Sequence, residues 1–270
     1  MPLNAIVWNV DPELLRIGSF AIRWYGVLFA LGFVFGYIIM LKIFKREGVP
    51  QALLDTLTTY MVVGTVVGAR LGHCLFYEPD YYLSNPVKIL YIWEGGLASH
   101  GAAIGILLAL WLFSRKSGKS WLWILDRIVI VVALAGFFIR TGNLMNSEIY
   151  GIETSLPWGF VFIRWNETVP KHPTQIYEGL SYLLIFIFLW RLYLAKGKNL
   201  TEGRLFGWFL VVLFSVRFLI EFIKEPQVEF ETTMLLNMGQ LLSLPFITAG
   251  IILLIRKKPS VRTTSGSGKG

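Results

Sequence analysis

The sequence is poor in cysteine and histidine, with one cysteine, Cys74, and three histidines among 270 residues. A single cysteine excludes an internal disulfide framework and any metal site built from several cysteines. The first residues, Met1 to Arg16, lack a basic stretch followed by an apolar core, so we do not expect a signal peptide there. No strong internal repeat supports the inverted symmetry of many transporters.

Charged residues are also scarce, at 16% of the chain, while 55% is hydrophobic and the mean hydropathy is +0.60. This is too apolar for a soluble domain, and several runs reach the ~20 residues that cross a bilayer. The sequence predicts an all-α integral membrane protein with seven transmembrane helices and a small external cap between the fourth and fifth. The predicted spans are Phe20–Phe44, Leu53–Tyr77, Leu97–Phe113, Trp121–Thr141, Pro173–Leu194, Leu205–Ile223 and Asn237–Ile255.

The net charge of +8 indicates orientation rather than a nucleic-acid partner, because lysines and arginines gather in alternate loops. They follow the first span, surround the turns between spans three and four and between five and six, and close the chain. The positive-inside rule then places the N-terminus outside and the C-terminus in the cytoplasm. We expect one transmembrane domain over residues 1–258, an external cap at about 143–172, and a disordered cytoplasmic tail at 259–270.

With this orientation, polar and ionisable side chains fall into the outer half of the bilayer in most spans. They are Arg23, Tyr25, Arg70, His73, His100, Arg140, His172, Gln175, Glu178, Arg217 and Glu221. Charge at this depth is costly and therefore indicates function. Because arginine forks suit phosphate oxygens, the pattern predicts a basic cavity for the phosphate of a lipid headgroup.

The stretch from Arg140 to Gly151 is the most polar of these places. We expect Gly142 to let the backbone leave the fourth helix and Gly151 to let it turn.

Three glycine series with a spacing of four predict close helix packing. They are Gly32 and Gly36; Gly64, Gly68 and Gly72; and Gly101 and Gly105.

Several of these residues also have purely structural interpretations. A lone arginine such as Arg140 can extend to the headgroups, and Arg70 can anchor a helix end. Arg217 and Glu221, four residues apart, can form an ordinary ion pair. Asp126 and Arg127 fit anchors at the cytoplasmic side.

Three other functional classes are compatible with a polar membrane protein of this length. A transporter or flippase for an anionic lipid or small anion is the main alternative, but polar groups confined to one leaflet favour no pathway across the bilayer. The seventh span has no lysine for a retinal Schiff base. An intramembrane protease is not indicated, because there is no His-Glu-x-x-His motif and no pair of aspartates within the spans.

Five polar blocks follow one another along the chain. They are Arg23-Trp-Tyr25-Gly, Gly95-Gly-Leu-Ala-Ser-His100-Gly, Arg140-Thr-Gly-Asn143-Leu-Met-Asn146-Ser-Glu148, His172-Pro-Thr-Gln175-Ile-Tyr-Glu178 and Arg217-Phe-Leu-Ile-Glu221-Phe. In content and order they resemble the signature blocks of the bacterial prolipoprotein diacylglyceryl transferase family. Two positions depart from some members: Ser99 replaces an aromatic residue, and Leu213 and Phe214 stand where a tyrosine precedes the last arginine by one turn.

The resemblance implies a seven-span enzyme of the bacterial inner membrane. Such an enzyme moves the diacylglyceryl group of phosphatidylglycerol onto the lipobox cysteine in the signal peptide of a prolipoprotein and releases glycerol phosphate. The catalytic positions it implies are His100, Arg140 and Arg217. For substrate binding we expect Tyr25, Arg140, Asn143, Glu148, Gln175, Glu178 and Glu221.

The reaction requires a cysteine thiol to attack the glycerol carbon that bears the phosphate ester. A free thiol has a pKa near ~8.5, so a nearby base helps, and His100 is the candidate. Arg140 is the first choice for stabilising the leaving phosphate, with Asn143 orienting the headgroup. Arg217 is the second cation, held by Glu221. We expect no cofactor and no metal, because no cluster has convincing ligand spacing.

Overall fold

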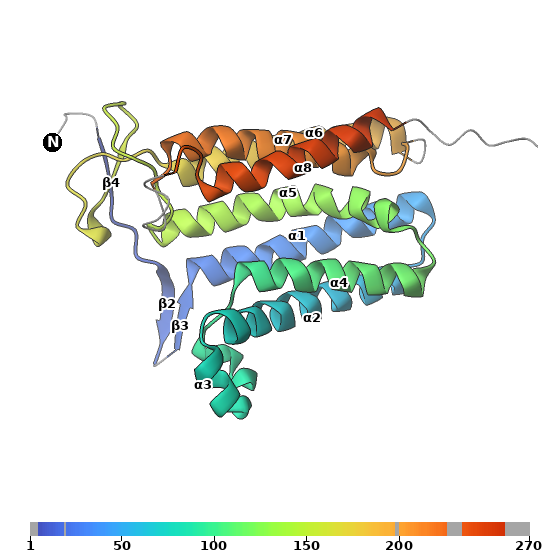
Figure 1. Ribbon diagram of the computed structural model, residues 1–270, viewed down its shortest axis with the longest axis horizontal. Helices are drawn as coiled ribbons and strands as arrows, with labels where there is room; N and C mark the ends of the chain where they lie inside the picture. The colour runs from blue at the N-terminus through green and yellow to red at the C-terminus, as the bar shows by residue number, and fades with distance from the viewer. Residues whose placement is uncertain (1–4, 19, 198–199, 226–233, 257–270) are drawn as a thin grey trace, which may run out of the picture.

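Long helices running side by side make up most of the structure, a computed structural model that describes residues 5–18, 20–197, 200–225 and 234–256. The predicted tail at 259–270 lies outside the described residues. The long helices are α1 (Trp24–Glu47), α2 (Gln51–Phe76), α4 (Ser99–Ser117), α5 (Trp121–Met145), α6 (Thr174–Lys196), α7 (Arg204–Ile220) and α8 (Met238–Ile255). In Figure 1 these helices lie side by side, each roughly along the long axis of the molecule.

The short elements gather at one end of this bundle, which we call the strand end (Figure 1). Strand β1 (Ile6–Trp8) pairs in parallel with β4 (Phe160–Phe162), and β2 (Glu13–Ile17) pairs antiparallel with β3 (Phe20–Arg23). The remaining short elements are α3 (Pro79–Ser84) and the 3-10 helices η1 (Pro86–Leu90), η2 (Ile92–Glu94), η3 (Ile163–Trp165) and η5 (Glu221–Ile223). The segment between α5 and α6 is thus tied to the N-terminal residues.

Six helices among the described residues are long and apolar enough to cross a membrane. They are α1, α2, α5, α6, α8 and the continuous stretch Arg204–Ile223 formed by α7 and η5. The chain is therefore a mostly helical, multi-pass membrane protein. Helix α4, which corresponds to the predicted third span, is not among the six; its 19 residues include His100, Arg115 and Lys116.

The glycine series bring helices into direct backbone contact, as predicted. A β-carbon added at Gly64 would lie 2.8 Å from the Ala109 side chain, and one at Gly101 would lie 2.6 Å from the α-carbon of Gly72. Gly32 similarly faces Ala135 across the contact between α1 and α5. Because these residues lack side chains, α2 and α4 pack with their backbones against each other.

The densest apolar packing lies at the end of the bundle away from the strands. Fully buried side chains there come from the end of α1, the start of α2, the end of α4, the start of α5, the end of α6 and the start of α7. They include Phe44, Leu54, Leu57, Phe113, Ile124, Leu189, Tyr193 and Leu205. Tight packing here fixes the positions of the helices that carry polar groups at the strand end.

Asp126 and Arg127 are buried in this packed end and bind other parts of the protein, so the expectation that they anchor a helix end at the membrane surface was wrong. Arg127 Nη2 donates to both carboxylate oxygens of Glu47, at 3.0 and 3.1 Å. Asp126 accepts from the backbone N–H groups of Gly203 and Phe206, each at 2.8 Å. Helix α7 begins at Arg204, so Asp126 satisfies donors that its first turn leaves unpaired.

Candidate active site

The last two turns of α5 bring Arg140 and Asn143 together. We expected Gly142 to end this helix, but α5 continues to Met145, and that expectation was wrong. Residues three apart share one helix face, and Arg140 Nη1 donates to Asn143 Oδ1 at 3.1 Å. Gly142 instead makes room for Tyr25, whose ring would lie 2.8 Å from an added β-carbon.

The turn after α5 carries Glu148 in a constrained backbone. Its neighbours Ser147 and Ile149 have φ angles of 56° and 62°, and positive φ is unfavourable for a β-branched residue such as isoleucine. Asn143 Nδ2 donates to Glu148 Oε1 at 2.7 Å. Gln175 Nε2 donates to the Glu148 carbonyl oxygen at 2.7 Å, so α6 also holds the turn.

A row of buried charges runs from α5 through α6 to η5. Arg140 Nε lies 2.6 Å from Glu178 Oε2, whose other oxygen lies 3.7 Å from Lys224 Nζ. Lys224 Nζ in turn lies 3.6 Å from Glu221 Oε2. Buried charges of this kind persist only when paired, so the row fixes the direction of the Arg140 guanidinium.

Arg217 has a different environment from the one expected. Within the described residues, no ion pair within 4.0 Å joins it to Glu221, and the expectation that Glu221 holds Arg217 was wrong. Glu221 faces Lys224 instead, and the first turn of α8 closes on its other side: a β-carbon added at Gly239 would lie 2.6 Å from the Glu221 carboxylate carbon. Arg217 is half-buried in the last turn of α7, without an anionic partner in the described part of the chain.

His100 lies exposed in the first turn of α4, at the strand end of the bundle. Its neighbour Gly101 packs on Gly68 and Gly72 of α2, which fixes the position of this turn. In the parts of the chain that the structure describes, no hydrogen bond or ion pair links His100 to Arg140 or Arg217.

Arg70 holds the segment that leads to His100, so its interpretation as a helix-end anchor was wrong. It is 3% exposed. Its guanidinium donates to the carbonyl oxygens of Lys88, Ile89 and Gly95 at 2.6, 2.9 and 2.5 Å, and to that of Gly96 at 3.2 Å. An arginine bonded to four backbone carbonyls organises a loop rather than binding an external anion.

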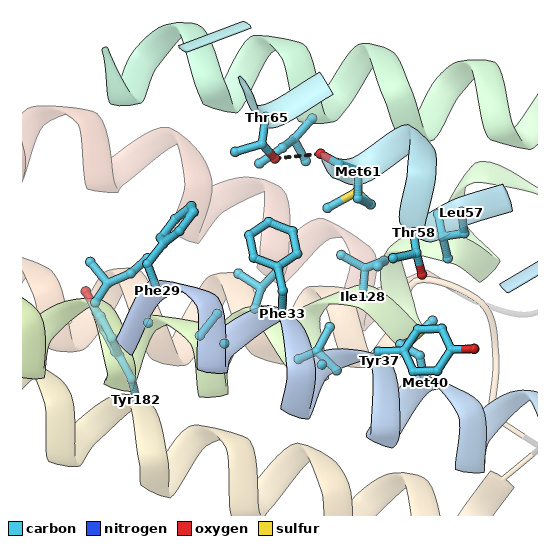
Figure 2. Close-up of a pocket in the computed structure, with 18 of the residues that line it drawn as sticks. Phe29, Phe33, Tyr37, Met40, Leu57, Thr58, Met61, Thr65, Ile128 and Tyr182 are labelled. Atoms are coloured by element: carbon cyan, nitrogen blue, oxygen red, sulfur yellow. Dashed lines mark hydrogen bonds between the residues drawn. The ribbon is translucent and has the colours of Figure 1, made fainter. Parts of the chain in front are cut away.

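An apolar cavity of about 390 Å³ lies between α1, α2, α5 and α7, with Ile106 of α4 and Tyr182 of α6 also in its wall. Figure 2 shows Phe29, Phe33 and Tyr37 of α1 on one side and Thr58 and Met61 of α2 on the other. The lining also includes Ile139 and Tyr182. Because Ile139 directly precedes Arg140, the cavity extends to the α5 turn that begins the row of charges.

Comparison with known proteins agrees with this arrangement. A family model described as prolipoprotein diacylglyceryl transferase matches residues 12–256. The chain belongs to this family.

A phosphatidylglycerol–prolipoprotein diacylglyceryl transferase of Tolumonas auensis is 52% identical, over 93% of this chain and 96% of the relative. Proteins of the same name from Porphyromonas gingivalis and Chloroherpeton thalassium are 48% and 44% identical, over 93% and 96% of this chain and 94% and 98% of the relatives. The transporter alternative has no support among these family members.

The roles of two residues in this region do not follow from the sequence. Lys224 is absent from the candidate residues that the sequence indicates, although its spacing of three from Glu221 is a signal for a side-chain pair. Arg70 was noticed but given the wrong role, because its partners are backbone carbonyls up to 26 positions away in sequence. A periodic pattern in the sequence cannot predict hydrogen bonds between a side chain and backbone carbonyls that are distant in sequence.

Proposed function

We propose that this chain transfers the diacylglyceryl group of phosphatidylglycerol to the lipobox cysteine of prolipoproteins, forming a thioether and releasing glycerol phosphate. The observation that carries this proposal is the Arg140 guanidinium. It is buried at one end of membrane-spanning helices and held between Asn143 and Glu178. Its family relatives bear names that state the same donor and acceptor.

The phosphate of the lipid binds between Arg140 and Arg217 in this proposal. As the carbon–oxygen bond of the ester breaks, negative charge grows on the departing glycerol phosphate, and fixed guanidinium donors stabilise it. Arg217 suits this role because no carboxylate of the described residues pairs with it. Asn143 and Glu148 orient the headgroup, and Tyr25 packs against the same turn of α5.

Glu178, Gln175 and Glu221 act by positioning. Glu178 fixes Arg140 through a contact of 2.6 Å, and Gln175 fixes the Glu148 backbone. Glu221 pairs with Lys224 and so leaves Arg217 to the substrate.

The nucleophile is the cysteine thiolate of the prolipoprotein. Its sulfur attacks the glycerol carbon that bears the phosphate, the carbon–sulfur bond forms, and the carbon–oxygen bond breaks. His100 takes the thiol proton, because a neutral imidazole is a base near neutral pH. Its exposed position at the strand end leaves room for an incoming peptide.

The apolar cavity receives an acyl chain of the donor lipid. Its volume of about 390 Å³ falls within the usual size of ligand pockets, and its walls are aliphatic and aromatic (Figure 2). Because it adjoins the turn that carries Arg140, a lipid can place its phosphate at the guanidinium and a tail in the cavity.

The topology that fits this chemistry has seven spans, with α4 as the third, in the bacterial inner membrane. The strand end is external and carries the cap at about 143–172. The opposite end is cytoplasmic, which is consistent with the basic residues in the last turns of α1, α4 and α6, among them Lys45, Arg115 and Lys196.

The test is thioether formation by the purified chain. Incubation with vesicles that contain phosphatidylglycerol and with a peptide bearing a lipobox cysteine should add a diacylglyceryl group to the peptide, measured by mass spectrometry. Vesicles of phosphatidylcholine alone, and a peptide with serine in place of cysteine, should give no product. An unmodified cysteine peptide in phosphatidylglycerol vesicles would sink the proposal.

A further inference from the structure

Lys224 is the most deeply buried lysine side chain near the row of charges. Only 3% of its side chain is exposed, and its ammonium lies 3.7 Å from Glu178 and 3.6 Å from Glu221. An ammonium buried to this degree is expensive to keep charged unless carboxylates surround it.

The backbone around Lys224 is fixed by the turn that follows Glu148. Gly151 pairs with Lys224 across an antiparallel bridge, and Ile152 donates its N–H to the Ile223 carbonyl at 3.0 Å. A β-carbon at Gly151 would collide with that same carbonyl and would lie 2.8 Å from the side chain of His172. The segment that carries Lys224 is therefore held against the segment that carries Glu148.

The charge balance of the site depends on this lysine. Arg140, Arg217 and Lys224 are the cations, and Glu148, Glu178 and Glu221 are the carboxylates. With Lys224 charged the two sets cancel, and a phosphodiester anion meets no net repulsion. Without it the site carries one excess negative charge, and Glu221 has lost its 3.6 Å partner.

We infer that Lys224 is a positioning residue for phosphatidylglycerol, whose ammonium occupies Glu178 and Glu221 and so leaves Arg140 and Arg217 to the lipid phosphate. This inference rests on the proposed function. It assigns Lys224 no contact with the reacting atoms, because its ammonium lies between two carboxylates and is almost fully enclosed.

The electrostatics of Lys224 give the inference a measurable pH dependence. Burial lowers the pKa of its ammonium, Glu178 and Glu221 raise it, and Arg140 and Arg217 lower it again, with a net shift below the ordinary value. Lys224 therefore loses its proton at a lower pH than an exposed lysine. Activity that needs its charge is present below that pKa and declines as the pH rises through it.

The experiment measures kcat and KM for phosphatidylglycerol with the full chain. The variants are Lys224→Met, which removes the charge, and Lys224→Arg, which keeps it at every accessible pH. Lys171→Met is the matched control. Lys171 is also a buried lysine, 2.5 Å from Glu225 and 3.6 Å from Glu167, but it lies outside the row of charges.

Lys224→Met should raise the KM for phosphatidylglycerol about ten-fold to a hundred-fold, the range expected when a buried carboxylate loses its partner and is left unsatisfied. Lys171→Met should leave that KM unchanged. In Lys224→Arg, activity should no longer decline at alkaline pH as it does in the parent chain. If Lys224 had only a structural role, this pH dependence would be the same in both proteins.

Two results would overturn the inference: equal KM values for Lys224→Met and Lys171→Met, or an unchanged alkaline decline in Lys224→Arg. The pH profile of Lys224→Arg tests the inference even if Lys224→Met fails to fold. Failure of the proposed function looks different, because the parent chain itself would then form no thioether.

Discussion

The arginines of this chain differ in what their guanidinium groups contact. Arg127 pairs with Glu47 at the packed end, and Arg70 donates to backbone carbonyls of the η1–η2 segment. Arg140 contacts Asn143 and Glu178, both close to the proposed lipid site. Arg217 has no anionic partner among the residues described. The two arginines assigned to phosphate are thus distinguished from the two that organise the protein.

At the residue scale, His100 is the proposed base. His100→Ala should lower the rate of thioether formation by about 10²–10⁴-fold near neutral pH, the usual contribution of general-base catalysis. The exposed side chain makes no hydrogen bond within the described residues, so folding should be unaffected, as measured by thermal unfolding in detergent.

Two comparisons interpret the His100 result. His100→Asn retains a hydrogen-bonding side chain without an accessible base, and so separates proton transfer from hydrogen bonding. Near-normal turnover of His100→Ala at neutral pH would assign the proton to another group.

Most polar residues near the site could be named from the sequence, but most of their partners could not. Arg140 and Asn143 are three apart on a helix, so their contact follows from helical spacing. The contacts of Arg140 with Glu178 and of Gln175 with Glu148 join different elements and depend on the tertiary arrangement. The pairing of Arg217 with Glu221 followed from spacing alone and was wrong, because a nearer cation, Lys224, occupies the carboxylate.

At the scale of elements, glycines set the distance between α2 and α4. Gly101→Ala should destabilise the protein by roughly 1–3 kcal/mol, the usual penalty of overpacking, because its new methyl group meets the backbone of Gly68 and Gly72. Thermal unfolding in detergent measures the effect.

Gly26→Ala is the control for that substitution. Gly26 also lies in a long helix, but nothing lies within 4 Å of an added β-carbon there. The change should therefore be neutral or stabilising by up to about 1 kcal/mol. A loss of stability as large as that of Gly101→Ala would show that helix packing is not the cause.

Hydrophobic runs in the sequence predict the long helices, but they do not predict the residues at which these helices begin and end. α1 begins at Trp24 rather than Phe20, because residues Phe20–Arg23 pair with β2 as a strand. α5 continues past Gly142 to Met145, and the glycine serves as the place where Tyr25 packs against the helix. In both cases the residue's role depends on a contact with a different segment, which the local sequence does not contain.

At the scale of the whole molecule, the two ends of the bundle differ in kind. Apolar side chains fill the end away from the strands, while the strand end holds the buried row that includes Arg140, Glu178 and Lys224. In the proposed function the lipid enters from one leaflet, and this asymmetry leaves the polar site reachable from that side.

The orientation of this asymmetry can be tested with reporter fusions. Helix α8 ends at Ile255, and a reporter fused after Lys258, which lies outside the described residues, tests on which side of the membrane that helix ends. Such a fusion should be active only when the reporter functions in the cytoplasm. Activity of an externally functioning reporter at this position would reverse the orientation and place the site at the inner leaflet.

The rate of thioether formation by Arg140→Lys tests the central claim most directly. Lysine keeps the charge, and so the ion pair with Glu178, but it loses the two parallel N–H donors that grip a phosphate. The account predicts normal folding and a rate about ten-fold to a hundred-fold below that of the parent chain. Arg16→Lys, at an exposed arginine paired with Glu13, is the control and should match the parent. Equal rates for Arg140→Lys and the parent chain would contradict the account.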